Sequence, residues 1–229
     1  KLWVRGAESH MSATWTGGRD QEGFASGTGT MQLFAGEKRV MLYEGPMAAG
    51  KFQGKGTMTW REKTVYNGTF VQGLPEGKML VKWPDGIVYE GEYVKGLRSG
   101  KGILTKPDGY VYEGQWFDDK RSGKGMTRYA NGEVYTGDYL NDRYNGLGLY
   151  KWLDGSSYEG GYLDGRRHGK GVFKWADGAV YRGDYSYGNR TGVGKLVFKD
   201  GSWYEGGFLA GRFSGYGTYY DAGRKTTQK

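Results

Sequence analysis

The sequence predicts an all-β fold, an elongated single twisted antiparallel sheet that runs as a meander of tandem β-hairpins. Two observations carry this prediction: a Tyr-x-Gly triplet recurs every 23 residues, and 45 glycines accompany 20 Tyr, 8 Trp and 9 Phe. Disordered Gly-rich chains lack such aromatics, because they cannot bury enough apolar surface to fold. Glycine combined with Tyr and Trp is typical of strands and tight turns.

The 23-residue repeat sets the organisation of the chain. Its triplet begins at Tyr43, Tyr66, Tyr89, Tyr112, Tyr135, Tyr158, Tyr181 and Tyr204. A glycine follows each of these tyrosines after eleven residues, and a second glycine comes two residues later in every repeat except the one that has Met79 there. An imperfect copy from Trp15 to Gly29 precedes the regular repeats, as expected of a terminal capping repeat.

Four segments follow from this frame. Residues 1–14 form an N-terminal segment in which Ser9-His10-Met11 resembles a cloning remnant, and we assign it no function. Residues 15–42 form the atypical capping repeat, residues 43–220 form eight tandem repeats, and residues 221–229 form a polar tail. We expect the end of this tail, Arg224–Lys229, to be disordered.

Each repeat is predicted to contain two strands joined by a three-residue turn such as Pro107-Asp108-Gly109. Only this turn length places Trp83 and Trp152 on the same face as the repeat tyrosines, because side chains alternate with period two. Glycines inside the strands are expected to leave room for a neighbouring ring to lie flat over the backbone. On the other face, the same register places three basic residues opposite acidic ones: Lys78, Lys124 and Lys170 opposite Glu92, Asp138 and Asp184.

These features closely resemble the MORN repeat. Tyr89-Glu90-Gly91-Glu92-Tyr93, followed by Gly100-Lys101-Gly102, is a near-complete instance, and the resemblance covers residues 43–217 strongly and 15–42 weakly. It implies an extended antiparallel sheet used for protein contacts in cytoskeletal, ciliary or membrane-junction structures, with binding of acidic phospholipids in some members. The sequence departs from the family pattern at Arg61-Glu62-Lys63, which replaces an Asp-Gly turn, and at Asn67, Thr136 and Arg182, which replace Glu.

Three functional hypotheses follow, and the first is a scaffold whose uncovered aromatic face binds protein partners, including a helical segment. Its predicted groove consists of Trp60, Trp83, Tyr93, Trp116, Tyr139, Trp152 and Trp175. The alternative for each single ring is that it packs only against other rings and glycines. The second hypothesis is a two-fold homodimer through the C-terminal strand edge. The residues expected there are Phe213, Tyr216, Tyr219 and Tyr220.

The third hypothesis is attachment to an acidic phospholipid membrane through basic loops between the hairpins. The expected residues are Lys95, Arg98, Lys120, Arg121, Arg166, Arg167, Lys170 and Arg190. Several aspartates, Asp118, Asp119, Asp142 and Asp164, lie among them, so a solvated edge of mixed charge is an equal alternative. Strong salt dependence of lipid binding would separate the two.

Other functions are disfavoured. The chain has no Cys and only two His, and no acidic or His cluster has metal-ligand spacing, so we expect no enzyme activity, no metal and no cofactor. None of the Gly-x-Gly pairs has the context of a phosphate-binding loop. The net charge of +8 permits an anionic partner, but a row of glutamates argues against nucleic acid. No apolar run is long enough to span a bilayer, and we expect a cytoplasmic, cytoskeleton- or membrane-associated location.

Overall fold

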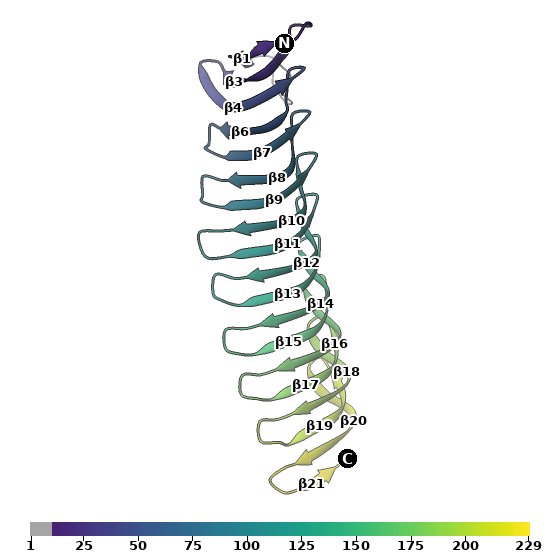
Figure 1. Ribbon diagram of the computed structural model, residues 1–229. Helices are drawn as coiled ribbons and strands as arrows, with labels where there is room; N and C mark the ends of the chain where they lie inside the picture. The colour runs from purple at the N-terminus through teal and green to yellow at the C-terminus, as the bar shows by residue number, and fades with distance from the viewer. Residues whose placement is uncertain (1–10) are drawn as a thin grey trace. The chain divides into compact units, whose positions relative to one another are not determined.

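The computed structural model describes residues 11–229, and the N-terminal part of the first predicted segment lies outside them. All of its regular secondary structure is strand, so the all-β prediction is confirmed. The chain forms two units, one up to Asp119 and one from Lys120 onward, and each is an open antiparallel sheet. In each unit, successive hairpins lie side by side in chain order (Figure 1).

Between residues 11 and 119 the first unit holds eleven strands, which include the capping repeat. Their bounds are β1 (Met11–Trp15), β2 (Gly18–Arg19), β3 (Ala25–Ala35), β4 (Lys38–Ala48), β5 (Lys51–Phe52), β6 (Gly54–Trp60), β7 (Val65–Val71), β8 (Leu74–Lys82), β9 (Val88–Val94), β10 (Leu97–Thr105) and β11 (Val111–Phe117). β1 and β2 both pair with β3, and the short β5 pairs with the last two residues of β4.

The second unit holds ten strands, each paired with the next. Their bounds are β12 (Lys120–Arg128), β13 (Val134–Leu140), β14 (Arg143–Lys151), β15 (Ser157–Leu163), β16 (Arg166–Lys174), β17 (Val180–Ser186), β18 (Asn189–Val197), β19 (Trp203–Leu209), β20 (Arg212–Asp221) and β21 (Thr226–Gln228). The expectation of a disordered tail is wrong for residues 226–228, because β21 pairs with residues 219–221 of β20. These tail residues therefore pair with part of the backbone edge of β20 that would otherwise be open.

The predicted three-residue turns and their register are confirmed. In the hairpin of β10 and β11, Leu104 lies opposite Tyr112, and the Lys106 amide donates to the Tyr110 carbonyl at 2.8 Å. Gly109 ends the turn with φ of 91°, in the left-handed region that glycine enters without strain. On the other face, two of the three predicted charge pairs form ion pairs, Lys124 with Asp138 at 2.9 Å and Lys170 with Asp184 at 2.7 Å. Lys78 stands opposite Glu92 as predicted.

Two-residue turns join one hairpin to the next. Lys95 and Gly96 both have positive φ, 50° and 87°, which is the type I′ geometry of the tightest hairpins. Asp118 and Asp119 adopt the same conformation without any glycine. Because the turn takes only two residues, the next strand begins at Leu97, earlier than the sequence pattern indicated.

Candidate partner-binding surface

The repeat tyrosines form the core of both units. Tyr158 is fully buried, and its ring covers two glycines, Gly160 in its own strand and Gly171 in the next. A Cβ at Gly171 would lie 2.4 Å from the Tyr158 hydroxyl oxygen. That hydroxyl donates to the Gly161 carbonyl at 3.0 Å, and burial raises the pKa of Tyr158 to about 12. The predicted role of the strand glycines is therefore confirmed.

The exception at Met79 has a structural consequence. Met79 stands opposite Gly68, and its sulfur occupies the space over that glycine. Met79 is buried, whereas Tyr66, the tyrosine of that repeat, is only partly buried. The side chain that replaces the second glycine thus takes the place that a tyrosine ring fills elsewhere.

Ring contacts continue from one repeat to the next. Tyr158 meets Tyr162 at 5.2 Å and Tyr185 at 5.1 Å between ring centroids, both nearly perpendicular. Edge-to-face contacts of this kind are the favoured aromatic geometry. These rings close the core, so the expectation of an uncovered aromatic face is wrong at their positions. Three residues of the predicted groove are buried in this way: Tyr93, Trp116 and Tyr139.

Arginines lie over the core rings. The Arg98 guanidinium carbon is 4.3 Å from the centroid of Trp116, and its Nε donates to Asp119 at 2.9 Å. Its Nη2 also donates to the Asp119 carbonyl. Arg121 repeats these contacts with Tyr139 and Asp142.

Two further arginines of the second unit follow the same arrangement. Arg167 lies 5.2 Å from the Tyr185 centroid and donates to the Gly188 carbonyl, and Arg190 lies 5.5 Å from Phe208 and donates to Gly211. Each arginine therefore ties a ring to the next two-residue turn.

These contacts divide the predicted lipid-binding residues into two groups. Arg98, Arg121, Arg167 and Arg190 lie against the aromatic core, and Lys170 is paired with Asp184 on the opposite face. Lys95, Lys120 and Arg166 are exposed at or beside the two-residue turns. The structure thus does not bring the eight residues together on one basic edge.

Partly exposed aromatics form a continuous row beside the three-residue turns of the second unit. Successive ring centroids are 6.1, 4.6, 5.2 and 4.6 Å apart along this row. The rings belong to Tyr129, Tyr150, Trp152, Phe173 and Trp175, and we call them the aromatic lane. All five are half-buried, which distinguishes them from the core rings. Two residues of the predicted groove, Trp152 and Trp175, lie in this lane.

The borders of the lane are polar. The Tyr150 hydroxyl donates to the Glu133 carboxylate at 2.7 Å, and burial together with this bond raises the pKa of Tyr150. Arg167 approaches Phe173 at 5.4 Å, and Arg190 approaches Trp175 at 5.7 Å. An apolar strip flanked by a carboxylate and two guanidinium groups suits a partner with both apolar and charged side chains.

The first unit has a less continuous row. Trp60 and Trp83 occupy the corresponding positions and are half-buried, but the next repeat has Lys106 there. The Lys106 ammonium lies 4.8 Å from the centroid of Tyr110. Of the five predicted tryptophans, Trp116 is therefore buried in the core, Trp60 and Trp83 belong to the row of the first unit, and Trp152 and Trp175 belong to the aromatic lane of the second. Tyr129, Tyr150 and Phe173 were not predicted to belong to a binding surface. The 23-residue repeat could have indicated them, because Tyr129 lies 23 residues before Trp152 and Tyr150 lies 23 residues before Phe173.

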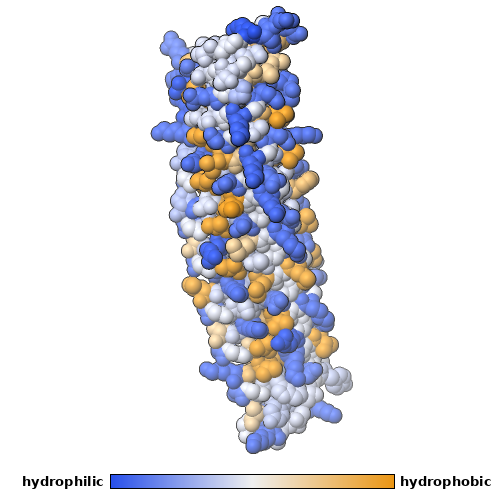
Figure 2. All heavy atoms as spheres, viewed as in Figure 1, coloured by the Kyte–Doolittle hydropathy of each residue, from blue (hydrophilic) through white to orange (hydrophobic). Residues whose placement is uncertain are grey.

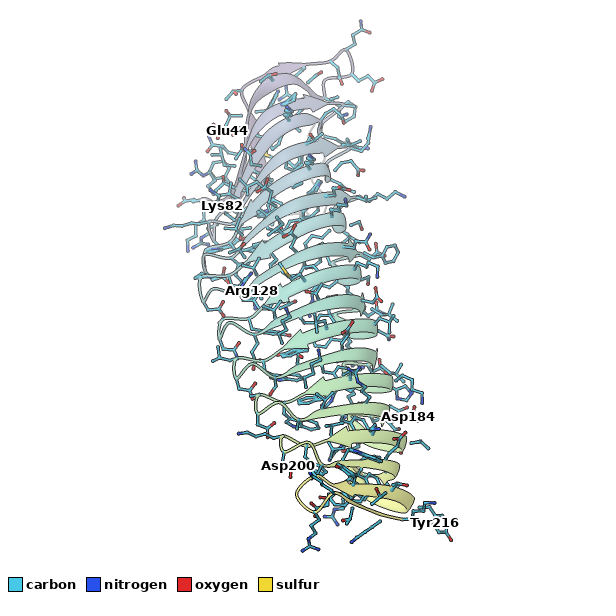
Figure 3. The ribbon with its side chains drawn as sticks, turned by 60° about the horizontal axis from the view of Figure 1, so that its bottom comes forward. Glu44, Lys82, Arg128, Asp184, Asp200 and Tyr216 are labelled. Atoms are coloured by element: carbon cyan, nitrogen blue, oxygen red, sulfur yellow. The ribbon has the colours of Figure 1, made fainter. Side chains whose placement is uncertain are left out.

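The predicted dimer edge is partly open. β21 covers only residues 219–221 of β20, and Phe213 and Tyr216 are exposed at 50% and 101%. Tyr216 projects toward the edge opposite the turn that holds Asp200 (Figure 3). Tyr219 and Tyr220 are half-buried, and the Tyr220 ring stacks on Trp203 at 5.9 Å.

Within residues 11–229 no group of three or more His, Asp or Glu side chains is placed to hold a metal ion. The described residues also include no helix that could cross a membrane. The aromatic lane is an extended surface of the second unit that combines partly exposed rings with charged borders.

Comparison with protein families assigns these repeats. The family model of the MORN repeat matches residues 43–65, 66–88, 89–109, 112–134, 135–157, 158–180, 181–203 and 204–223. The chain belongs to the MORN repeat family. Its eight matched MORN repeats coincide with the eight Tyr-x-Gly triplets, so the resemblance inferred from the sequence is confirmed. Comparison with curated protein sequences gave no significant match.

Several solved structures resemble this MORN array at a distance. The TCP10 domain of Danio rerio CPAP in complex with a peptide of STIL shares 13% identity and a TM-score of 0.43, over 85% of this chain and 93% of that chain. The Drosophila melanogaster SAS-4 TCP domain, in complex with a proline-rich motif of Ana2, shares 12% identity and a TM-score of 0.40, over 81% and 97%. Scores at this level carry no conclusion about the ligands of the MORN array.

Proposed function

We propose that this MORN array is a non-enzymatic scaffold that binds a protein segment along the aromatic lane. The observation that carries the proposal is the unbroken contact of five half-buried rings from Tyr129 to Trp175. Tyr and Trp at such positions dominate binding energy in protein interfaces. The core rings beneath the lane are fixed by packing, so its shape is preorganised and little ordering entropy is lost on binding.

The dimensions of the lane suit a helical partner. It runs from the end of β12 to the end of β16, four strand intervals or about 19 Å. A helix of about 13 residues has this length. An amphipathic helix would place apolar side chains on the rings, with basic residues near Glu133 and acidic ones near Arg167 and Arg190.

Selection from a peptide library tests this function. Random peptides displayed on phage are selected on the wild-type chain, and the enriched peptides are then measured against a Trp152→Ala/Trp175→Ala variant. We expect binding to weaken at least about tenfold, because central aromatic anchors each contribute more than about 1 kcal/mol. Trp203→Ala is the matched control, since Trp203 is a half-buried tryptophan outside the lane. Equal binding to wild type and the double variant would exclude the lane as the site.

Self-association and membrane attachment are secondary proposals. Phe213 and Tyr216 expose an apolar strand edge that a second copy could cover, and sedimentation velocity of a Phe213→Lys variant tests this dimer. For membranes, the exposed Lys95, Lys120 and Arg166 are the candidates, and flotation with phosphatidylserine vesicles over a salt series tests them. The location we propose is cytoplasmic, in a cytoskeletal, ciliary or membrane-associated assembly, which fractionation of cells would check.

A further inference from the structure

The face of the second unit opposite to the buried tyrosines carries a groove of about 720 Å³. It crosses the strands from β13 to β17, and the glycine backbone of β14 to β17 forms its floor. Two rows of side chains border it: Leu149, Glu159, Val172 and Arg182 on one side, and Leu147 and Lys170 on the other. We call it the outer groove. On the face in view in Figure 2, apolar residues are likewise interrupted by hydrophilic ones.

The outer groove is open because β15 contributes no side chain to the row that holds Leu147 and Lys170. Leu147 stands opposite Gly161, whereas the equivalent Lys170 stands opposite Asp184 and pairs with it. Leu147 is therefore 70% exposed. An added Cβ at Gly161 would lie 2.1 Å from the His168 carbonyl oxygen, so the backbone itself keeps the position empty.

Two opposite charges border the groove without neutralising each other. Glu159 and Arg182 lie on either side of Val172 in successive strands, about 10 Å apart at the usual strand spacing. Within residues 11–229 neither takes part in an ion pair, although the directly opposed Lys195 and Glu205 form one at 2.9 Å. The groove therefore presents a free carboxylate and a free guanidinium with an apolar residue between them.

The shape of the groove restricts what can occupy it. Its two rows lie two residues apart along each strand, which is about 7 Å. An α-helix with its side chains is roughly 10–12 Å wide and does not fit between them. Addition of a β-strand is also excluded, because β13 to β17 are paired on both sides. The remaining candidate occupant of the groove is an extended segment that crosses the strands.

The charge spacing matches one extended conformation. A polyproline II helix rises about 3.1 Å per residue with three residues per turn, so residues i and i+3 point to the same side about 9 Å apart. This distance agrees with the two strand intervals between Glu159 and Arg182. Acidic and basic side chains at i and i+3 would reach Arg182 and Glu159. An apolar side chain between them points about 120° away from this row, toward the glycine floor and Leu147 in the second row.

We propose that the outer groove binds a polyproline II segment of a partner protein that carries opposite charges three residues apart and an apolar residue between them. The Arg182 guanidinium holds the acidic residue, and the Glu159 carboxylate holds the basic one. Leu147 and the glycine floor contact the apolar side chain. This site lies on the opposite face from the aromatic lane and is independent of the proposed function.

A labelled synthetic peptide tests the proposal by fluorescence anisotropy with the full chain. The probe is Pro-Pro-Asp-Leu-Pro-Arg-Pro-Pro, and the control Pro-Pro-Asp-Arg-Pro-Leu-Pro-Pro has the same composition with adjacent charges. We expect the probe to bind at least about tenfold more tightly than the control, since only the probe can engage both charged residues. Arg182→Glu and Glu159→Gln should each weaken probe binding, and increasing salt should do the same.

Controls separate this site from the aromatic lane. The Trp152→Ala/Trp175→Ala variant should bind the probe as the wild type does, whereas loss of binding in it would overturn the assignment. Equal affinity for the two peptides, or no binding of the probe at millimolar concentration, would also overturn it. Concentration-dependent association of the chain that Leu147→Lys abolishes would show that a second copy covers the groove, and the proposal would then be wrong.

Discussion

Replacement of Gly171 by alanine should destabilise the second unit strongly, although the change adds a single methyl group. The new Cβ would lie 2.4 Å from the Tyr158 hydroxyl oxygen and 2.5 Å from Cε2 of the same ring. Ordinary contacts between carbon atoms are about 3.5–4.0 Å, so the ring has to move. Tyr158 is 0% exposed and packs against Tyr162 and Tyr185, so its movement disturbs two further rings.

The expected loss can be estimated from two contributions. Overpacking of a rigid core costs about 1–3 kcal/mol. The displaced Tyr158 hydroxyl also loses its bond to the Gly161 carbonyl, which contributes about 1 kcal/mol. We therefore expect Gly171→Ala to lower the free energy of unfolding by about 3 kcal/mol.

Urea unfolding, followed by circular dichroism and tryptophan fluorescence, measures this loss. Gly169→Ala is the control: nothing lies within 4 Å of its added Cβ, but its φ of +71° is left-handed. It should cost only about 1 kcal/mol. In a Tyr158→Leu background the clash is absent, so Gly171→Ala should then cost under about 1 kcal/mol. A loss of under about 0.5 kcal/mol for Gly171→Ala, or strict additivity with Tyr158→Leu, would refute the reasoning.

Three further predictions concern the core and its charges. Arg98→Met removes the stacking of the guanidinium on Trp116 and both side-chain bonds to Asp119, so unfolding experiments should show a loss of about 2 kcal/mol in the free energy of unfolding. Arg98→Lys should show nearly the same loss, because an ammonium does not reproduce the planar guanidinium contacts. Because burial raises the pKa of Tyr158 to about 12, stability should be unaffected below pH 10 and should fall as the pH rises from 10 to about 12, where the unfolded chain ionises before the folded one. The tyrosinate absorbance of the buried rings should then rise together with loss of circular dichroism. A complete rise, for all 20 tyrosines, that leaves the dichroism intact would contradict the prediction. The hydrogen bond from Lys124 lowers the pKa of Asp138 below its ordinary 3.8, so the stability difference between wild type and Lys124→Met, under about 1 kcal/mol at pH 7, should disappear as the pH falls through the lowered value.

Local rules were enough to predict the repeats and their register. Asp-Gly and Asn-Gly turns define hairpins, and period-two alternation allows only one register that keeps the tyrosines and Trp83 on one face. Glycine at two fixed positions per repeat likewise indicated flat-lying rings, and the Tyr158 ring over Gly171 confirms this. These features depend on residues that are close in sequence or related by the repeat, so an amino-acid pattern is sufficient to show them.

The exposure of individual side chains was decided by the tertiary structure. Nothing in the sequence marks Lys95 as left-handed, so the turn was expected to be longer and Arg98 was assigned to a basic loop. Because the turn takes only Lys95 and Gly96, Arg98 belongs to β10 and its side chain faces the core. Trp116 was assigned to an open groove, but a ring of the preceding repeat, Tyr89, meets it at 5.4 Å. Burial depends on what neighbouring repeats place over a residue, and a single repeat does not contain that information. The sequence therefore determined the sheet and its packing unit, whereas contacts between repeats determined which aromatic and charged side chains remain available to partners.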